Sequence, residues 1–301
     1  MKKLVNSIFL LILFIFISVI IILTTTGIKT NKFNKLISSK VSQSKNINIQ
    51  LDSVKFKIDP KKISLFLETQ NPKIIYRNIN IPITNIKVYI DFLSFLKSEA
   101  KIKKITLNLK ELDIVQVNEL SSTIKPSNFK SLLNNRVKEG KLITEIEIFL
   151  TDKGLLKDFI AKGNVKNLKI ELFEDLSFSN TNFSFFSDKD DILIQNIFGN
   201  IDKTYISDGD IKLNLDNGIN LVSTFNSEIN LNDKFFNRYS KFLDKYITTG
   251  KLNSLKANFQ NNISIDLDET YKVKNYNYNI SGNIEKANLK LLKTFKSKLF
   301  T

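Results

Sequence analysis

The sequence predicts a mainly β protein: an elongated, curled antiparallel sheet with a few short helices, preceded by one N-terminal transmembrane helix. Three observations predict this fold class. Apolar and polar residues alternate with a period of two over much of the chain beyond residue 46, which is typical of strands with one buried face. Short turn signals separate these runs at intervals of about 8 to 12 residues, as in a meander. Residues 8–23 are instead all apolar except Ser18.

Lys2 and Lys3 precede the apolar N-terminal run. As a helix rising about 1.5 Å per residue, the stretch from Leu4 to Ile28 would be roughly 37 Å long, and a bilayer's hydrocarbon core is about 30 Å thick. We therefore expect a signal anchor over residues 1–28. The alternative is a cleaved signal peptide, although the small residues before Ile28 resemble a cleavage site poorly. The lysines that follow favour a cytoplasmic location for that flank.

Composition excludes most familiar catalytic chemistry. The chain of 301 residues has no Cys and no His, so thiolate nucleophiles, sulfur-ligated metals and the commonest general base are missing. Nine Gly and four Pro are too few for glycine-rich phosphate loops or long linkers. We therefore expect no enzymatic activity, no cofactor and no metal site, with a hydrolase as the least favoured alternative.

The net charge of +15 does not indicate a nucleic-acid partner. Three of the 45 basic residues are Arg, the side chain that specific readers of nucleic acid favour. Seven lysines and no acidic residue lie within residues 1–51, next to the predicted anchor. Basicity there suits an anionic membrane surface.

The predicted elements follow from periodicity. After a juxtamembrane helix or linker at 29–45, we expect a first β-module at 46–120 and a helix-interrupted meander at 121–301 that continues in a longer architecture. Helices are predicted at 33–41, 127–140 and 232–248. Strands are predicted at 47–51, 54–58, 63–68, 74–76, 83–92, 101–117 with a bulge near Glu111, 142–150, 159–165, 168–173, 178–186, 192–201, 211–215, 219–231 and within 252–284. Turns are predicted at 162–164, 188–191, 208–210 and 216–218.

Two details of these elements bear on function. In KIKKITLNLKELDIVQV (101–117), Ile105, Leu107 and Leu109 point one way, and Thr106, Asn108 and Lys110 are expected to face water. The three Asp of the turn at 188–191 resemble part of a calcium loop. They lack the loop Gly and distal Glu of an EF-hand, so we interpret them as a hairpin turn.

The order of parts resembles the AsmA-like family, which includes the TamB- and YhdP-type envelope proteins of Gram-negative bacteria. An extended strand, a short Leu-rich helix and an Ile-x-x-Ile-x-Leu strand match residues 83–91, 92–96 and 102–109 loosely. The stretch NDKFFNRYSKFLDKYITTG (232–250) resembles a helix that ends in Gly before the next sheet. The family's larger members are much longer than this chain.

The resemblance implies an inner-membrane protein with one span and the bulk of the chain in the periplasm. It also implies a uniformly apolar β-groove that binds phospholipid acyl chains in lipid transport or outer-membrane biogenesis. Such a groove would contain no catalytic residues and no cofactors. The alternative is a membrane-anchored assembly factor with a filled core, which binds other envelope proteins by adding strands to an exposed edge. On the groove interpretation the predicted lipid contacts are Ile105, Leu107, Leu109, Phe183, Phe185, Ile192, Ile194, Ile211, Leu213 and Leu215.

Overall fold

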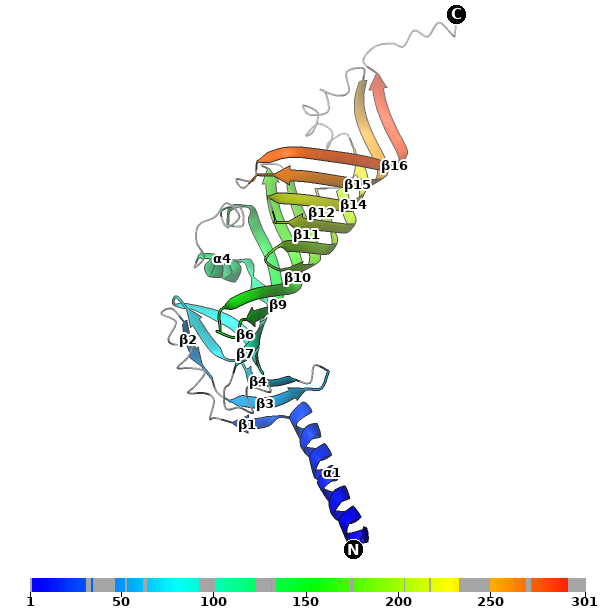
Figure 1. The fold of residues 1–301 in the computed structure, drawn as a ribbon. Helices are drawn as coiled ribbons and strands as arrows, with labels where there is room; N and C mark the ends of the chain where they lie inside the picture. The colour runs from blue at the N-terminus through cyan, green and yellow to red at the C-terminus, as the bar shows by residue number, and fades with distance from the viewer. Residues whose placement is uncertain are drawn as a thin grey trace, which may run out of the picture. The chain divides into compact units, whose positions relative to one another are not determined.

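The chain folds mainly into β-strands that belong to one antiparallel sheet, which is not closed into a barrel (Figure 1). The predicted fold class is thus confirmed. The computed structural model describes residues 2–30, 34, 47–51, 53–61, 64–91, 101–122, 131, 134–173, 176–202, 204–216, 218–232, 250–268 and 272–291.

The chain divides into two compact units, one comprising Met1–Lys125 with Leu142–Gly163 and the other Pro126–Lys141 with Asn164–Thr301. Strands β9 and β10 contribute residues to both units. The first unit contains α1 (Lys2–Thr24), β1 (Ile28–Thr30), β2 (Ile47–Gln50), β3 (Val54–Asp59), β4 (Ser64–Gln70), β5 (Lys73–Tyr76), β6 (Ile79–Ile90), β7 (Ile102–Leu109), β8 (Leu112–Asp113), α4 (Ile114–Ser122), and parts of β9 (Val137–Leu150) and β10 (Leu156–Phe173).

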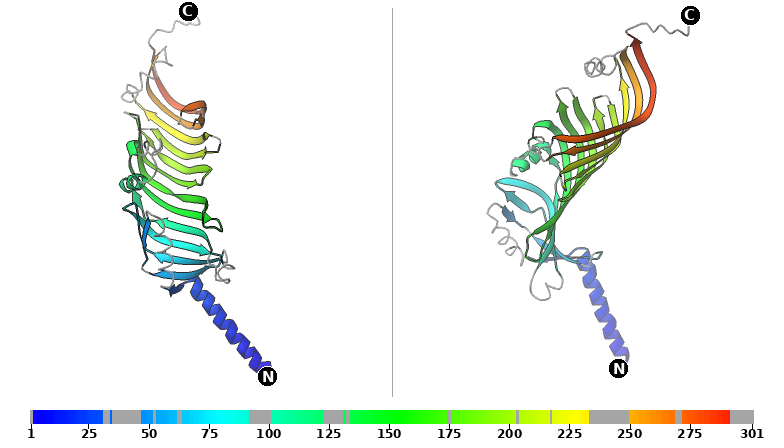
Figure 2. Two further views of the ribbon diagram at one scale, coloured as in Figure 1. Left: turned by 60° about the vertical axis from the view of Figure 1, so that its left-hand side comes forward. Right: turned by 45° about the horizontal axis from the view of Figure 1, so that its top comes forward.

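The second unit is a meander in which consecutive strands are neighbours, from β10 to β16 (Figure 2). Its remaining strands are β11 (Leu176–Ser187), β12 (Asp191–Ile201), β13 (Thr204–Asn214), β14 (Ile219–Leu231), β15 (Gly250–Leu267) and β16 (Val273–Leu291). Strand β14 has the predicted bounds, and its residues alternate between more and less exposed positions over all 13 residues.

Helix α1 is long and apolar enough to cross a membrane. Its 23 residues span about 34 Å, and none of its apolar stretch Asn6–Thr24 is buried against the rest of the protein. The helix ends four residues earlier than expected: Gly27 has a φ of +69°, and Ile28 already begins β1, which pairs with β3. Thr25 Oγ1 donates a hydrogen bond to the Ile21 carbonyl, 2.6 Å away, near the end of the helix.

Strand β6 belongs to two layers of the first unit. Its first residues pair with β5, as in Ile74↔Ile81, and β5 pairs in turn with β2. Its later residues pair with β4 on one side and β7 on the other, as in Thr69↔Ile86 and Ile86↔Leu107. Between the two layers lie the buried side chains of the first unit's core: Ile49, Ile74, Ile83, Ile86, Val54, Leu67 and Ile90.

Within the strand predicted at 101–117, residues 102–109 form β7 and residues 112–113 form the short β8. The predicted continuation of the strand to residue 117 is wrong, because α4 begins at Ile114. The Asp113 carboxylate accepts a hydrogen bond from the Gln116 backbone N–H at 2.9 Å, and Gln116 Oε1 accepts one from the Asp113 N–H at 3.1 Å. This reciprocal capping box satisfies two donors that a helix start leaves free.

The other predicted helices are borne out only in part or lie outside the described residues. Within the helix expected at 127–140, residues 131 and 134–136 are helical as predicted, whereas Val137 and Gly140 lie in β9. Most residues before them lie outside the described part of the chain, as do nearly all of 33–41 and 232–248, and the whole of 92–100.

Two predicted turns are wrong for a common reason. Gly163 lies inside β10 and Gly209 inside β13. A Cβ at Gly163 would lie 2.0 Å from the Ile143 carbonyl oxygen, and one at Gly209 would lie 2.8 Å from the Ile197 Cβ. Each glycine therefore permits a close approach between paired strands. The turns at 188–191 and 216–218 do separate strands as expected.

Candidate functional site

The candidate site of the first unit begins with two rows of apolar side chains on one face of the sheet. Strand registers place one residue from each of β3, β4, β6, β7 and β9 side by side in each row. The first row is Val54, Thr69, Ile86, Leu107 and Ile146, and the second is Phe56, Leu67, Val88, Ile105 and Ile148. Period-two alternation puts all ten on the same face.

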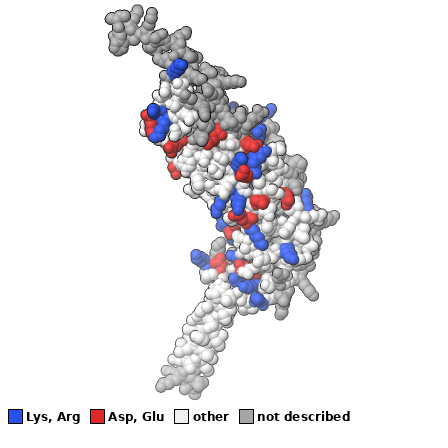
Figure 3. Space-filling view, turned by 180° about the vertical axis from the view of Figure 1, so that it is seen from behind, with Lys and Arg blue, Asp and Glu red and all other residues white. Residues whose placement is uncertain are grey.

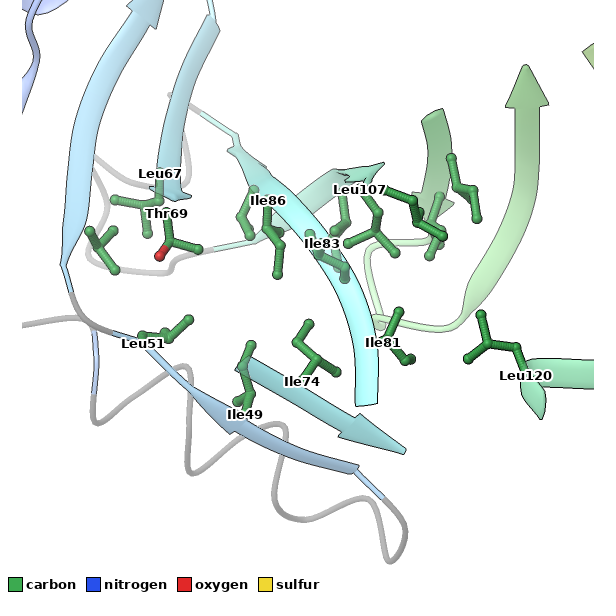
Figure 4. Close-up of a pocket in the computed structure, with 16 residues that line it drawn as sticks. Ile49, Leu51, Leu67, Thr69, Ile74, Ile81, Ile83, Ile86, Leu107 and Leu120 are labelled. Carbon is green, nitrogen blue, oxygen red and sulfur yellow. The ribbon is translucent and has the colours of Figure 1, made fainter. Parts of the chain in front are cut away.

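The layer formed by β2, β5 and the start of β6 stands over these rows and leaves a pocket of about 430 Å³ (Figure 4). Leu120 from α4 also lines it. The lining side chains are aliphatic except for Thr69: Ile49, Leu51, Val54, Leu67, Thr69, Ile74, Ile81, Ile83, Ile86, Val88, Ile105, Leu107, Leu109, Leu120, Ile146 and Ile148. Such a surface can bind an apolar chain by the hydrophobic effect.

Thr69 is the polar exception in this pocket. Its side chain is 6% exposed, and its Oγ1 has no hydrogen-bond partner among the described residues. The residues that flank it across the sheet are Val54 and Ile86, whose side chains carry no polar atoms. Figure 4 shows the Thr69 oxygen directed toward the layer that carries Leu51.

The opposite face of the first unit's sheet carries charged and aromatic side chains in register. Lys57 is 2.7 Å from Glu68, and Lys104 is 3.2 Å from Glu147, counting nitrogen to oxygen. Lys104 also lies 4.4 Å from the ring centre of Tyr89. Burial raises the pKa of the Tyr89 phenol, with smaller contributions from nearby carboxylates.

The expectation that Thr106 faces water is wrong. Thr106 is on this polar face, but it is 4% exposed, with Lys87 and Glu147 as its cross-strand neighbours. Long side chains on both sides exclude water from a short one between them. Asn108 is half-buried and donates to Asn85 Oδ1 at 2.7 Å, whereas Lys110 is exposed as predicted.

The surface charges of the protein are of both signs. Figure 3 shows acidic and basic residues intermixed on the face it presents, while the described side chains of α1 are free of charge. Several pairs are exposed ion pairs, such as Lys256 with Glu285 at 2.5 Å. That pairing raises the pKa of Lys256 and lowers the pKa of Glu285.

The second unit carries a similar arrangement of apolar side chains on its part of the sheet. The strand registers align one row across β11 to β16, which is Phe185, Ile194, Ile211, Ser223, Ile263 and Tyr278, and a second row across β12 to β16, which is Ile192, Leu213, Leu221, Ile265 and Tyr276. A pocket of about 250 Å³ opens on this face. It is lined by Leu168, Ile170, Phe178, Thr181, Phe183, Ile194, Ile197, Ile201, Ile206, Gly209, Ile211, Ser223 and Phe225.

This face is less uniformly apolar than expected. Asn261 is 3% exposed, and its Nδ2 donates to Ser227 Oγ at 2.9 Å while its Oδ1 accepts from the Tyr278 hydroxyl at 2.8 Å. Thr181 and Ser223 are buried at the pocket itself. Buried polar groups are tolerated when they are hydrogen-bonded, which explains the Asn261 cluster.

The structure divides the ten predicted lipid contacts between the two units. Ile105, Leu107 and Leu109 line the first unit's pocket, and Phe183, Ile194 and Ile211 line the second unit's pocket. The registers add Phe185, Ile192 and Leu213 to the same face of the second unit. Leu215 lies just beyond β13 and is 39% exposed, outside both pocket linings.

Sequence reasoning missed the residues that complete the first pocket from other elements. Ile49, Ile74 and Ile81 come from the covering layer and Leu120 from α4. Ile74 and Ile81 are partners in the β5–β6 hairpin, whereas Ile49 joins them through the β2–β5 pairing, which is distant in sequence. The position of Thr69 on the apolar face could have been predicted, because Thr69 follows Leu65 and Leu67 at every second residue.

The acidic turn at 188–191 is a hairpin turn, as predicted. The Asp188 carboxylate accepts hydrogen bonds from the backbone N–H groups of Asp190 and Asp191, at 2.9 and 2.8 Å. These bonds hold the pKa of Asp188 below its usual value, the bond from Asp191 contributing most. Both hydrogen bonds lie within the turn, so the Asp188 carboxylate stabilises the turn itself.

One edge of the second unit's sheet is long and partly apolar. Strand β16 pairs with β15 and with no other described strand. Tyr276 is 73% exposed and Ile284 61%. An unpaired edge of this length can accept a further strand.

Comparisons of the chain with protein-family models, with curated proteins and with solved structures found no match.

Proposed function

We propose that the chain is a membrane-anchored, non-enzymatic protein that holds phospholipid acyl chains on the apolar faces of its β-sheet. The observation that carries the proposal is the pocket of about 430 Å³ in the first unit, aliphatic except for Thr69. At about 25 cal/mol per Å² of apolar surface removed from water, such a lining favours a hydrocarbon chain over water. The second unit offers a further pocket that is mainly apolar and also contains Thr181 and Ser223.

The proposal includes an AsmA-like role in phospholipid transport or outer-membrane biogenesis. In it, α1 anchors the protein in an inner membrane and the β units lie in the periplasm. Support for the anchor comes from the apolarity and exposure of Asn6–Thr24. A topology reporter inserted after Thr30 tests the location: activity only in the periplasm supports the proposal, and activity in the cytoplasm overturns it.

Lipid binding is tested with the full chain purified in detergent and analysed by native mass spectrometry. Two neighbouring positions provide a matched pair, because Leu109 at the end of β7 lines the first unit's pocket and Lys110 next to it is exposed. We expect the wild type and Lys110→Asp to retain phospholipid and Leu109→Asp to retain less. Lipid around α1 is common to all three and cancels in the comparison.

Equal retention by the two variants would contradict the proposal, provided that circular dichroism shows both to be folded. Should Leu109→Asp fail to fold, Leu109→Asn makes a milder polar change at the same place. Its expected result is the same in direction and smaller in size.

The alternative function is that of an assembly factor that binds envelope proteins by strand addition. The observation that favours it is the exposed edge of β16. Proline is placed at Asn279 in one variant and at Ile280 in another, because the backbone N–H groups of successive strand residues point to opposite sides and proline lacks the donor that a further strand requires. If either variant abolished binding of a protein partner without changing lipid retention, the assembly-factor function would be favoured over lipid binding.

A further inference from the structure

We propose that the first unit's pocket is an acyl-ester site, in which the Thr69 hydroxyl donates a hydrogen bond to the neutral ester carbonyl of one bound acyl chain. This inference rests on the proposed function and adds to it the ligand's functional group and the residue that recognises it.

The first argument is the unusual state of the Thr69 hydroxyl. It is buried, it lacks a partner among the described residues, and its cross-strand neighbours Val54 and Ile86 offer none. Leaving a buried hydroxyl unpaired is unfavourable, so buried polar groups in folded proteins generally have a partner. A ligand in the pocket can supply that partner.

The second argument is location. Several other buried side-chain oxygens lack a hydrogen-bond partner in the described residues, namely those of Asn34, Ser64, Thr106 and Asn118, while the Glu68 carboxylate is paired with Lys57. None of these residues lines the pocket, whereas Thr69 does. An apolar pocket with one convergent polar group is the usual form of a site that orients a mostly apolar ligand.

The chemistry of the lining selects the ligand's functional group. Among the described residues no charged side chain lines the pocket, so an ionised carboxylate would lose its hydration without gaining a cation. A neutral ester carbonyl accepts a hydrogen bond and carries no such penalty. The hydrocarbon chain then occupies the aliphatic remainder of the pocket.

The pocket also fits one chain in size. A methylene group fills roughly the ~30 Å³ that a water molecule occupies in the liquid, so about 430 Å³ holds about 14 carbons. The ester could belong to a phospholipid or to a free single-chain lipid, since both present the same carbonyl and chain. The test separates these sources.

The test compares four forms of the full chain: wild type, Thr69→Val, Thr69→Ser and Thr106→Val. Thr69→Val replaces the hydroxyl with a methyl group of similar shape. Thr69→Ser keeps the hydroxyl. Thr106→Val is the matched control, because Thr106 is equally buried and unpartnered but lies on the opposite face of the same sheet.

The ligands are methyl myristate, tetradecane and myristic acid at pH 8, with dimyristoyl phosphatidylcholine as the membrane-lipid arm. We expect Thr69→Val to weaken methyl myristate binding by about tenfold, which is the loss of affinity expected when one hydrogen bond is removed. The same substitution should change tetradecane binding much less. Thr69→Ser and Thr106→Val should bind the ester like the wild type. Ionised myristic acid should bind more weakly than its ester.

A spectroscopic measurement separates a hydrogen bond from a packing effect. With a ¹³C-labelled ester carbonyl, we expect the infrared carbonyl stretch of the bound ester at lower frequency in the wild type than in Thr69→Val. The same difference with carbonyl-labelled phosphatidylcholine would identify membrane lipid as a ligand. Its appearance with methyl myristate alone would identify a single-chain ester.

Two results would overturn the inference. One is an unchanged ester affinity and carbonyl frequency in Thr69→Val, and the other is an equal loss in Thr69→Val and Thr106→Val. In either case the proposed function stands if the wild type still binds the ester and tetradecane. If the wild type binds none of the ligands, the proposed function fails as well.

Discussion

The size of the first unit's pocket predicts how acyl-chain affinity depends on chain length. Each methylene moved from water into an apolar site contributes about 0.8 kcal/mol, or roughly a fourfold gain in affinity. With about 14 carbons accommodated in about 430 Å³, the affinity of linear methyl esters should rise up to about that length and then level off, because further carbons remain outside.

The substitution Leu107→Ala should move this limit. Leu107 lines the pocket, and its truncation removes three carbon groups, which adds roughly 90 Å³ if each fills about 30 Å³. The plateau should shift from about 14 to about 17 carbons. Since Leu107 is only half-buried, we expect a loss of unfolding free energy of about 2 kcal/mol, at the low end for such changes.

The assay is displacement of a fluorescent acyl probe from the full chain held in an amphipathic polymer, with esters of 8 to 20 carbons delivered from cyclodextrin. Val115→Ala on α4 is the control, because Val115 is 62% exposed and does not line the pocket. A plateau at the same length in wild type and Leu107→Ala would refute the reasoning, as would an affinity that rises steadily to 20 carbons.

Three further predictions concern the elements that shape the units. Asp113→Ala removes half of the capping box with Gln116 and should lower the unfolding free energy by about 1 kcal/mol in denaturant titration; no change would mean that α4 does not depend on its cap. Gly163→Ala should destabilise the protein markedly, because its Cβ would meet the Ile143 carbonyl oxygen at 2.0 Å, so an unchanged melting temperature would contradict the strand pairing. Asp188 has a lowered pKa in the folded protein, so its stabilising effect is present above the unfolded pKa of about 3.9 and is lost as pH falls through the folded value. The difference in unfolding free energy between the wild type and Asp188→Asn should therefore shrink as the pH falls from 6 to 3. A difference that stays constant over this range would argue against a lowered pKa for Asp188.

Strands were predictable where alternation is long and local. The alternation of β14 sets both of its ends, and Ile105 and Leu107 were placed on the apolar face correctly. The same rule failed after Leu109, because the apolar residues of α4 are too few to reveal a helical period. The capping box of Asp113 and Gln116 was the available signal.

Other features could not be read from local patterns. Taken alone, a glycine at position 163 or 209 indicates a turn. In the structure each of these glycines instead allows two paired strands to approach closely. The first pocket depends on β2 and β5 lying over the other strands of the first unit, and β2 reaches β5 by a pairing that is distant in sequence. The burial of Thr106 likewise depends on Lys87 and Glu147 from neighbouring strands.

Photo-crosslinking in membranes tests the central claim most directly, namely that the apolar face holds acyl chains. A photoreactive amino acid is placed in the full chain at Leu107 or at Lys87, which lie on opposite faces of the first unit's sheet. Mass spectrometry then identifies any attached lipid. We predict phospholipid adducts at Leu107 and few at Lys87. Equal labelling at the two positions, or labelling at Lys87 alone, would contradict the claim.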